Sequence, residues 1–364
     1  MPAGHDLIVV GAGAVGLAVA DRFLSRRPEA SVLVCEDESF PAGSRAAGAM
    51  IVAWSESTAQ ARQQAGFSER MDAAELALRS WREELSEAEV DGIPVVTTRG
   101  LNVVLGAAAP KPEVDNFAAI REVLDERKVR WETVDVELVA GLEPEPEYGA
   151  AEAIYIPEEF VVDAALLSVW RRRRLAERGA RFRRGRVRPV ERGERVVGVE
   201  TESEEVLESE AVVLAAGSAS RRLAPESVRD LIPPLYSGVG TAATVRFDKP
   251  RPVDAFRTAN RSFACGLHLL PSAGGSVYVG ATNEPSRTPP SRPSVSDVEF
   301  LLRCAVLQVN RELHRAQVDG LRVGSRPTPA DAVAMVGPVV DGLWMATGGL
   351  RDGLTHAPAT ADRL

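Results

Sequence analysis

The stretch "DLIVVGAGAVGLAVADRFLSRRPEASVLVCEDE", residues 6–38, decides the fold. Its first apolar and β-branched run, residues 7–10, predicts a short buried strand. A helix is expected over residues 14–26, with Pro28 just beyond its end, and a second buried strand is expected over residues 31–35. This strand–helix–strand order predicts an α/β protein built on a parallel sheet.

Three glycines stand between the first strand and the helix in the spacing G-x-G-x-x-G. Gly11 suits a tight turn, Gly13 lets the backbone approach a pyrophosphate, and Gly16 lets the helix pack closely on the strand. Glu36, at the end of the second strand, is placed to accept hydrogen bonds from a ribose diol, which disfavours NADP but leaves FAD and NAD open. The candidate dinucleotide-binding residues here are Gly11, Gly13, Ala14, Val15, Gly16, Glu36 and Asp37.

Composition narrows the class of protein. The 364 residues exceed the usual size of one domain, so two domains are expected. A net charge of −9 argues against nucleic acid as a partner. One basic run, residues 170–188, leaves two interpretations open, a nucleic-acid patch or a basic helix face followed by a strand; the second fits its spacing better.

Neither a membrane segment nor a disulfide framework is expected. The apolar residues 7–20 follow a start without Lys or Arg, and glycines interrupt them, so a signal peptide is disfavoured. Cys35, Cys265 and Cys304 lie far apart without CxxC spacing, which predicts no disulfide and no metal site. A reducing cytoplasm is the simplest compartment for such a chain.

Three later segments add small residues where a ligand could approach the backbone. They are "SFPAGSRAAGAM" (39–50), "ESEAVVLAAGSAS" (208–220), which contains an expected strand over residues 211–214, and the closing "MATGGLRDGLTHAPATADRL" (345–364). Pro358 suits the first turn of a helix beginning in the last segment.

Taken together, these motifs resemble the FAD-dependent glycine oxidase and D-amino-acid oxidase family, over residues 6–362, with glycine oxidase the nearest likeness. The resemblance implies an α/β fold with a Rossmann-type FAD-binding domain and a second, mainly antiparallel β-sheet substrate domain. It implies non-covalent FAD, with the ADP half at the first glycines and the flavin ring at the closing segment. The further cofactor residues it implies are Ser44, Arg45, Ala46, Ala47, Gly48, Val187, Ala216, Gly217, Gly348, Gly349, Leu350, Arg351, Asp352, Gly353, Leu354 and Thr355.

The resemblance also implies a substrate site. Arg326, in "VGSRPTP", and Arg351 match arginines that bind the substrate carboxylate, a role suited to a planar, permanently charged guanidinium. His268 stands where glycine oxidase has a tyrosine that contacts the carboxylate, and Asn283 stands where it has a methionine beside the substrate. Both changes add polarity, which predicts a larger or more polar substrate than glycine.

The activity implied is oxidation of an amino acid or N-substituted amino acid to an imine by hydride transfer to flavin N5, with O2 reoxidising the flavin to give hydrogen peroxide. The expected partners are a carboxylate-bearing amine, O2 and a second copy of the chain. Three alternatives stay open: an FAD-dependent dehydrogenase of a 2-hydroxy acid or amino acid with a quinone or carrier-protein acceptor, an NAD-dependent enzyme, and a non-catalytic flavin-binding protein.

The domains are expected to be discontinuous. Residues 1–90, 151–224 and 331–364 form the expected FAD-binding domain, and residues 91–150 and 225–330 form the expected substrate domain. Helices are expected over residues 70–89, 113–128, 163–178 and 296–313.

Overall fold

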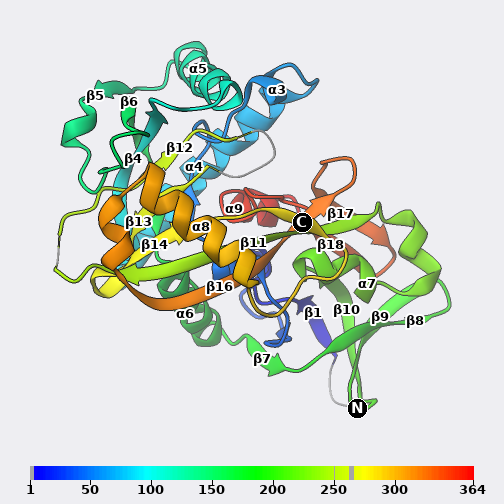
Figure 1. The fold of residues 1–364 in the computed structure, drawn as a ribbon. Coiled ribbons are helices and arrows are strands. Elements are labelled where there is room, and N and C mark those ends of the chain that lie inside the picture. The colour runs from blue at the N-terminus through cyan, green and yellow to red at the C-terminus, as the bar shows by residue number, and fades with distance from the viewer. Residues whose placement is uncertain (1–3, 250, 262–265) are drawn as a thin grey trace.

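The computed structural model of the protein describes residues 4–249, 251–261 and 266–364 (Figure 1). Two sheets organise the chain, and both are assembled from segments far apart in the sequence. A cavity lies where the two sheets meet.

The first sheet has the strand order β17-β18-β10-β1-β2-β7, with β9 pairing to β10 and β8 to β9. Strands β18, β10, β1, β2 and β7 run parallel, so their carboxyl ends meet along one edge. The strands are β1 (His5–Val10), β2 (Val32–Glu36), β7 (Arg181–Arg184), β8 (Val187–Arg192), β9 (Arg195–Thr201), β10 (Val206–Leu214), β17 (Met335–Val340) and β18 (Leu343–Thr347).

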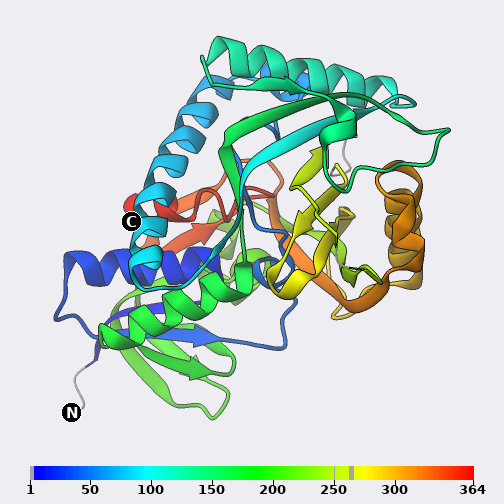
Figure 2. The same ribbon diagram turned by 90° about the vertical axis from the view of Figure 1, so that its left-hand side faces the viewer.

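The central strands of this sheet are covered on both faces, which explains their unbroken apolar sequences. Helix α1 (Ala14–Arg26) packs against α6 (Ala164–Glu177) and α9 (Ala357–Asp362), and α9 packs against α4 (Phe67–Val90) (Figure 2). Helix α1, near the start of the chain, and helix α9, near its end, therefore lie side by side.

The second sheet has ten strands among the described residues and follows the order β15-β11-β14-β13-β12-β4-β6-β3, with β16 paired to β11 and β5 to β6. All pairs are antiparallel except β12 with β4. The strands are β3 (Met50–Ile51), β4 (Val96–Gly106), β5 (Glu132–Val134), β6 (Ala150–Val162), β11 (Leu235–Arg246), β12 (Phe256–Thr258), β13 (His268–Pro271), β14 (Val277–Gly280), β15 (Glu284–Ser286) and β16 (Gln317–Pro329).

The remaining helices pack around the second sheet or lie where it meets the first sheet. They are α2 (Gly43–Ala46), α3 (Ala59–Arg62), α5 (Lys111–Glu126), α7 (Ser220–Leu223) and α8 (Val295–Gln308). Helix α8 lies along β11 and β14 (Figure 1). The expected fold class, a parallel sheet joined to a mainly antiparallel one, is confirmed.

Several boundaries differ from expectation. Strand β3, within the expected residues 1–90 of the FAD-binding domain, pairs with β6 of the second sheet. Strand β6 pairs with β4 in the second sheet, so residues 150–162 lie outside the first sheet, whereas the expected boundary placed residues from 151 onward with it. The helix expected over residues 296–313 ends at Gln308, and a separate 3-10 turn covers Arg311–Arg315, where the side chain of Asn310 accepts a hydrogen bond from Glu312 N.

The basic run contains the expected helix face and strand, α6 and β7. Its arginines form ion pairs with acids on other elements: Arg171 with Glu84, Arg172 with Glu36, and Arg174 with Asp21. Arg171 is 2% exposed, so this charge of the basic run is buried and paired. Its guanidinium lies 4.9 Å from the ring of Trp81, which adds a cation–π contact to the ion pair.

The cysteine expectations concern three residues, of which Cys265 lies outside the described part of the chain. Cys35 and Cys304 have free thiols, and burial raises the pKa of Cys35 to about 12. Within the described residues, no group of three or more His, Cys, Asp or Glu side chains is placed to hold a metal ion. No helix in that part of the chain is long and apolar enough to span a bilayer.

Candidate active site

A cavity of about 1320 Å³ runs along the carboxyl edge of the first sheet and reaches β11, β14 and β16 of the second. Its walls therefore come from both sheets and from the closing segment of the chain. The edge where parallel strands end is the usual ligand site of an open α/β sheet, because helix N-termini and loops converge there.

The first glycines shape one end of the cavity. Gly11 has φ +118°, and a Cβ atom built on it would lie 2.4 Å from the carbonyl oxygen of Ala215. A Cβ on Gly16 would lie 1.8 Å from the oxygen of Gly11, so only glycine allows α1 to begin this close to the strand. Gly13 caps α1 without a side chain, and Ala14 N donates to Ser44 Oγ over 3.0 Å.

Acidic residues follow β2 at the same end. Glu36 lines the cavity and accepts a 2.7 Å hydrogen bond from Arg172 Nη2. A carboxylate has capacity for several hydrogen bonds, so this ion pair is compatible with the ribose role expected of Glu36. Asp37 accepts a 2.8 Å hydrogen bond from Arg186 Nε.

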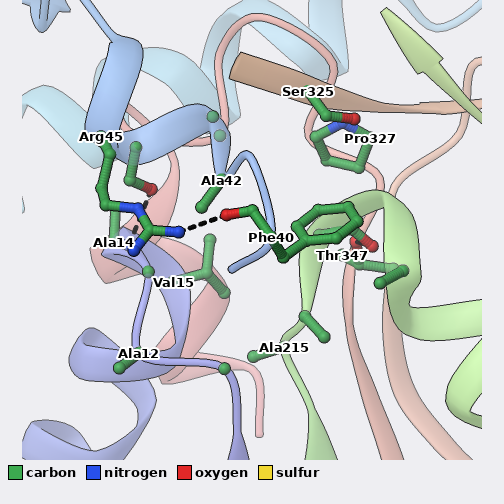
Figure 3. Close-up of a pocket in the computed structure, with 18 of the residues that line it drawn as sticks. Ala12, Ala14, Val15, Phe40, Ala42, Arg45, Ala215, Ser325, Pro327 and Thr347 are labelled. Atoms are coloured by element: carbon green, nitrogen blue, oxygen red, sulfur yellow. Dashed lines mark hydrogen bonds between the residues drawn. The ribbon is translucent and has the colours of Figure 1, made fainter. Parts of the chain in front are cut away.

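The segment after β2, residues 40–47, contributes to the wall of the cavity. Phe40 directs its ring toward Pro327 and Thr347, and Arg45 donates to the carbonyl oxygen of Phe40 (Figure 3). The guanidinium of Arg222 lies 5.9 Å from the centre of that ring. This part of the lining is therefore aromatic and basic.

The closing segment forms the other end of the cavity. Gly348 has φ +86°, and a Cβ on Gly349 would lie 2.6 Å from the Cα of Gly353, so the backbone folds tightly on itself. Leu350 N donates to the oxygen of Pro327 over 3.0 Å, which joins this segment to β16. Helix α9 then begins at Ala357, with a proline in its first turn.

Most of the residues expected from the sequence converge on this one cavity. Those in its lining are Gly11, Gly13, Ala14, Val15, Glu36, Asp37, Ser44, Arg45, Ala46, Ala47, Val187, Ala216, Gly217, Arg326, Gly349, Leu350, Arg351, Gly353 and Leu354. Those outside the lining are Gly16, Gly48, His268, Asn283, Gly348, Asp352 and Thr355. Gly48 is instead packed against Tyr278, and Thr355 accepts a hydrogen bond from Trp81 Nε1 at its carbonyl oxygen.

Arg326 extends from β16 across Gly240 of β11. Its Nη1 atom donates to the carbonyl oxygen of Thr282 over 3.0 Å and to Asn283 Oδ1 over 3.1 Å. A Cβ on Gly240 would lie 2.4 Å from Nη1, so the guanidinium occupies the space that this glycine leaves. Asn283 lies outside the cavity lining and contacts Arg326, which is part of the lining.

Arg351 lies at the same end and approaches an acid that was not expected from the sequence. Its Nη1 atom is 3.3 Å from Glu56 Oε2. The other carboxylate oxygen of Glu56 forms an ion pair with Arg257, which is 0% exposed. Burial raises the pKa of the neighbouring Asp352 carboxyl, and the charge of Glu56 raises it further.

His268 is buried next to this cluster, on β13 opposite Arg257 of β12. Burial lowers its pKa to about 3, and the charge of Arg257 acts in the same direction. The imidazole is neutral at physiological pH, and its Nδ1 atom has no hydrogen-bond partner among the described residues. Its ring is nearly parallel to that of Tyr278, at 6.4 Å between centres.

Sequence reasoning missed Glu56, Arg257 and Asn260. The available signal was weak: Arg257 lies between Asp254 and Arg261 in a stretch of mixed polar and apolar residues, so its position in the sequence does not predict burial. Nothing in the spacing of Glu56 distinguishes it from a surface glutamate, because its partners come from β12 and from the closing segment.

The residues present fit an elongated dinucleotide. The glycines at one end would hold a pyrophosphate near the N-terminus of α1, and the folded backbone at the other end would lie against a flavin ring. The fold and the cavity are those of a dinucleotide-binding protein built on two sheets.

The chain belongs to the FAD dependent oxidoreductase family, whose model matches residues 6–364. Glycine oxidase from Pseudomonas aeruginosa is 30% identical over 174 residues, which span 46% of this chain and 44% of that relative. The alignment thus covers under half of the length of the curated relative.

Solved structures share the fold over nearly the whole chain. Glycine oxidase from Geobacillus kaustophilus has a TM-score of 0.80 at 24% identity, covering 99% of this chain and 93% of that chain. Iminodiacetate oxidase from Chelativorans sp. BNC1 has a TM-score of 0.80 at 18% identity, covering 98% and 93%. At these identities the likeness defines the fold.

Proposed function

We propose that the protein oxidises the C–N bond of an amino acid or N-substituted amino acid to an imine, using FAD, with O2 as the final acceptor. One observation carries the proposal: Arg326 and Arg351 reach the same cavity as the dinucleotide-binding glycines. Two guanidiniums at the expected flavin end suit an anionic substrate, because each presents a planar fork of donors to a carboxylate.

The residues of the chain act mainly by positioning. Arg326 and Arg351 bind the carboxylate and so orient the carbon next to the amine. Bound FAD supplies the hydride acceptor, and O2 takes up the two electrons to give hydrogen peroxide. The amine is oxidised to the imine with loss of one hydride and one proton, and water then hydrolyses the imine. Orienting the reactants supplies much of the acceleration in such a site.

Polar neighbours support a substrate more polar than glycine. Asn283 supports the guanidinium of Arg326, and His268 is a neutral, buried imidazole beside the arginine cluster. Both side chains lie outside the cavity lining, so their polarity would act on a ligand through the arginines beside them. We therefore propose an N-substituted glycine or a polar amino acid over free glycine.

The test is anaerobic mixing of the FAD-loaded protein with a panel of amino acids and N-substituted glycines, followed by admission of O2. Bleaching of the flavin, then recovery with stoichiometric peroxide, is expected for an oxidase. Bleaching without rapid recovery in O2 would favour the dehydrogenase alternative. Oxidation of glycine as efficient as that of every larger substrate would contradict the polar-substrate proposal.

A further inference from the structure

Glu56 lies between two guanidinium groups that come from different parts of the fold. Its Oε1 atom forms an ion pair with Arg257 of β12, and its Oε2 atom is 3.3 Å from Nη1 of Arg351 in the closing segment. The Glu56 side chain is 14% exposed, and Arg257 is completely buried. Only Arg351 of the three lines the cavity.

Asn260 forms hydrogen bonds with both Glu56 and Arg257. Its Nδ2 atom donates to Glu56 Oε2 over 3.0 Å, and its Oδ1 atom accepts from Arg257 Nη2 over 2.7 Å. Arg257 Nε donates to the carbonyl oxygen of Thr258 over 3.1 Å. Glu56, Arg257 and Asn260, here called the Glu56 brace, are thus joined by mutual contacts.

The loop that carries Glu56 is itself fixed by a second buried carboxylate. Glu159 of β6 is 0% exposed, and its Oε1 atom accepts hydrogen bonds from the backbone N–H groups of Ala53, Trp54 and Ser55 at 2.9, 2.8 and 3.0 Å. The backbone leading to Glu56 is therefore held by the second sheet, and the carboxylate has little freedom to follow a moving partner.

The charge of Glu56 is stable. Burial raises the pKa of a carboxyl group, but here Arg257 and Arg351 outweigh burial, and the pKa of Glu56 is held well below its usual range. The contact with Arg351 is consequently charge-assisted, which makes it stronger than a neutral hydrogen bond.

We propose that Glu56 is a positioning residue, which holds the guanidinium of Arg351 so that its remaining donors face the substrate carboxylate. The inference rests on the proposed function of Arg351. A long arginine side chain is flexible, and a contact on one side of its rigid fork fixes the direction of the other donors.

Two rival roles make different predictions. If Glu56 acted only through its charge, its removal would strengthen the binding of an anion. If it only neutralised Arg257, removal of both charges would restore full binding. The Glu56 brace predicts weaker anion binding in the single variant of Glu56 and in the double variant of Glu56 and Arg257. In both variants, Arg351 loses its contact with Glu56.

The experiment measures the binding of (methylthio)acetate, a carboxylate with a thioether in place of the amine, to the FAD-loaded protein by calorimetry and by the flavin absorption change. Glu56→Gln is expected to weaken binding about tenfold, the loss typical of one contact to a charged group. Glu56→Gln with Arg257→Met is expected to recover the thermal midpoint but not the affinity. Glu143→Gln, which removes an ion pair with Arg251 away from the cavity, is the control.

A double-mutant cycle assigns the effect to Arg351. In an Arg351→Ala background, Glu56→Gln is expected to change the affinity by less than about twofold, because the supported group is gone. Tighter binding by Glu56→Gln, recovery of affinity in the charge-balanced double variant, or no binding by the wild type would each overturn the inference. Failure of every amine to bleach the wild-type flavin would instead overturn the proposed oxidation, and this binding cycle does not depend on that result.

Discussion

Gly240 leaves the space that the guanidinium of Arg326 occupies. A Cβ on Gly240 would lie 2.4 Å from Nη1 and 2.6 Å from Nη2 of Arg326, and both residues reach the cavity from adjacent strands. The position of the proposed carboxylate-binding arginine is therefore set by the absence of a side chain on its neighbour.

Gly240→Ala is expected to displace the guanidinium of Arg326 without unfolding the sheet, because the end of a long side chain can move. KM for the carboxylate substrate should rise about tenfold or more, with a much smaller change in the thermal midpoint. Steady-state kinetics and thermal unfolding measure the two effects. Gly320→Ala, on β16, is the control, since no atom lies within 4 Å of a Cβ built there. An unchanged KM would contradict the steric role.

Arg326→Lys should retain the positive charge but lose the fork that binds a carboxylate with two parallel hydrogen bonds. We expect KM to rise by about tenfold to a hundredfold, with a smaller effect on kcat, because the loss falls mainly on binding. Arg322→Lys, on the same strand and also in the cavity lining, provides the comparison. Equal effects of the two substitutions would mean that Arg326 contributes only charge.

Gly13→Ala should separate cofactor binding from folding. A Cβ at this position would meet only Ser44 Oγ, at 3.2 Å, so the protein itself has almost enough room. The methyl group would, however, face the expected pyrophosphate, and FAD affinity should fall about tenfold or more. The ratio of flavin to protein absorbance and titration of the apoprotein with FAD give the result. Gly106→Ala, where the nearest atom is 3.7 Å away, should retain full FAD content.

His268 should make stability depend on pH. Its folded-state pKa of about 3 lies below the ordinary value of 6.5, so the unfolded state binds more protons as the pH falls below 6.5. The contribution of neutral His268 to the free energy of unfolding is therefore complete above pH 6.5. It is lost progressively as the pH falls to about 3. By pH 5 the loss is about 2 kcal/mol.

Chemical denaturation at pH 7 and pH 5 tests this dependence. His268→Gln should reduce the fall in unfolding free energy between the two values by about 2 kcal/mol. His314→Gln removes an exposed histidine and should leave the fall unchanged. A wild-type slope reproduced in His268→Gln would show that other groups cause the dependence.

The parts of the site that depend on backbone proximity could be predicted from the sequence. Gly11 and Gly16 are required by contacts with main-chain atoms that lie near them in the chain or at the next parallel strand. The spacing of the motif encodes the contact of Gly16 with Gly11, and the tight turn after β1 predicts glycine at position 11 before its partner Ala215 is known. The same holds for the tight turn of Gly349 and Gly353, because both residues belong to one short segment.

The Glu56 brace could not be predicted, because its members come from separate elements of the second sheet and its loops. Asn260 and Glu56 are 204 residues apart, and no periodicity links them. Arg171 and Arg257 are buried, yet in a chain with 40 arginines neither stands out from residues that face solvent. Burial of a charge is a property of the tertiary partner, and the partner has no fixed offset.

The strand order β18-β10-β1 has a consequence for synthesis of the protein. Strand β10 gains its neighbour β18 only after the ribosome has made every strand of the second sheet. The nascent chain must therefore keep its apolar first strands from associating with other molecules until β18 has been made. We expect cofactor capture to occur only after residues 343–347 emerge, because this strand completes the edge of the sheet that lines the cavity.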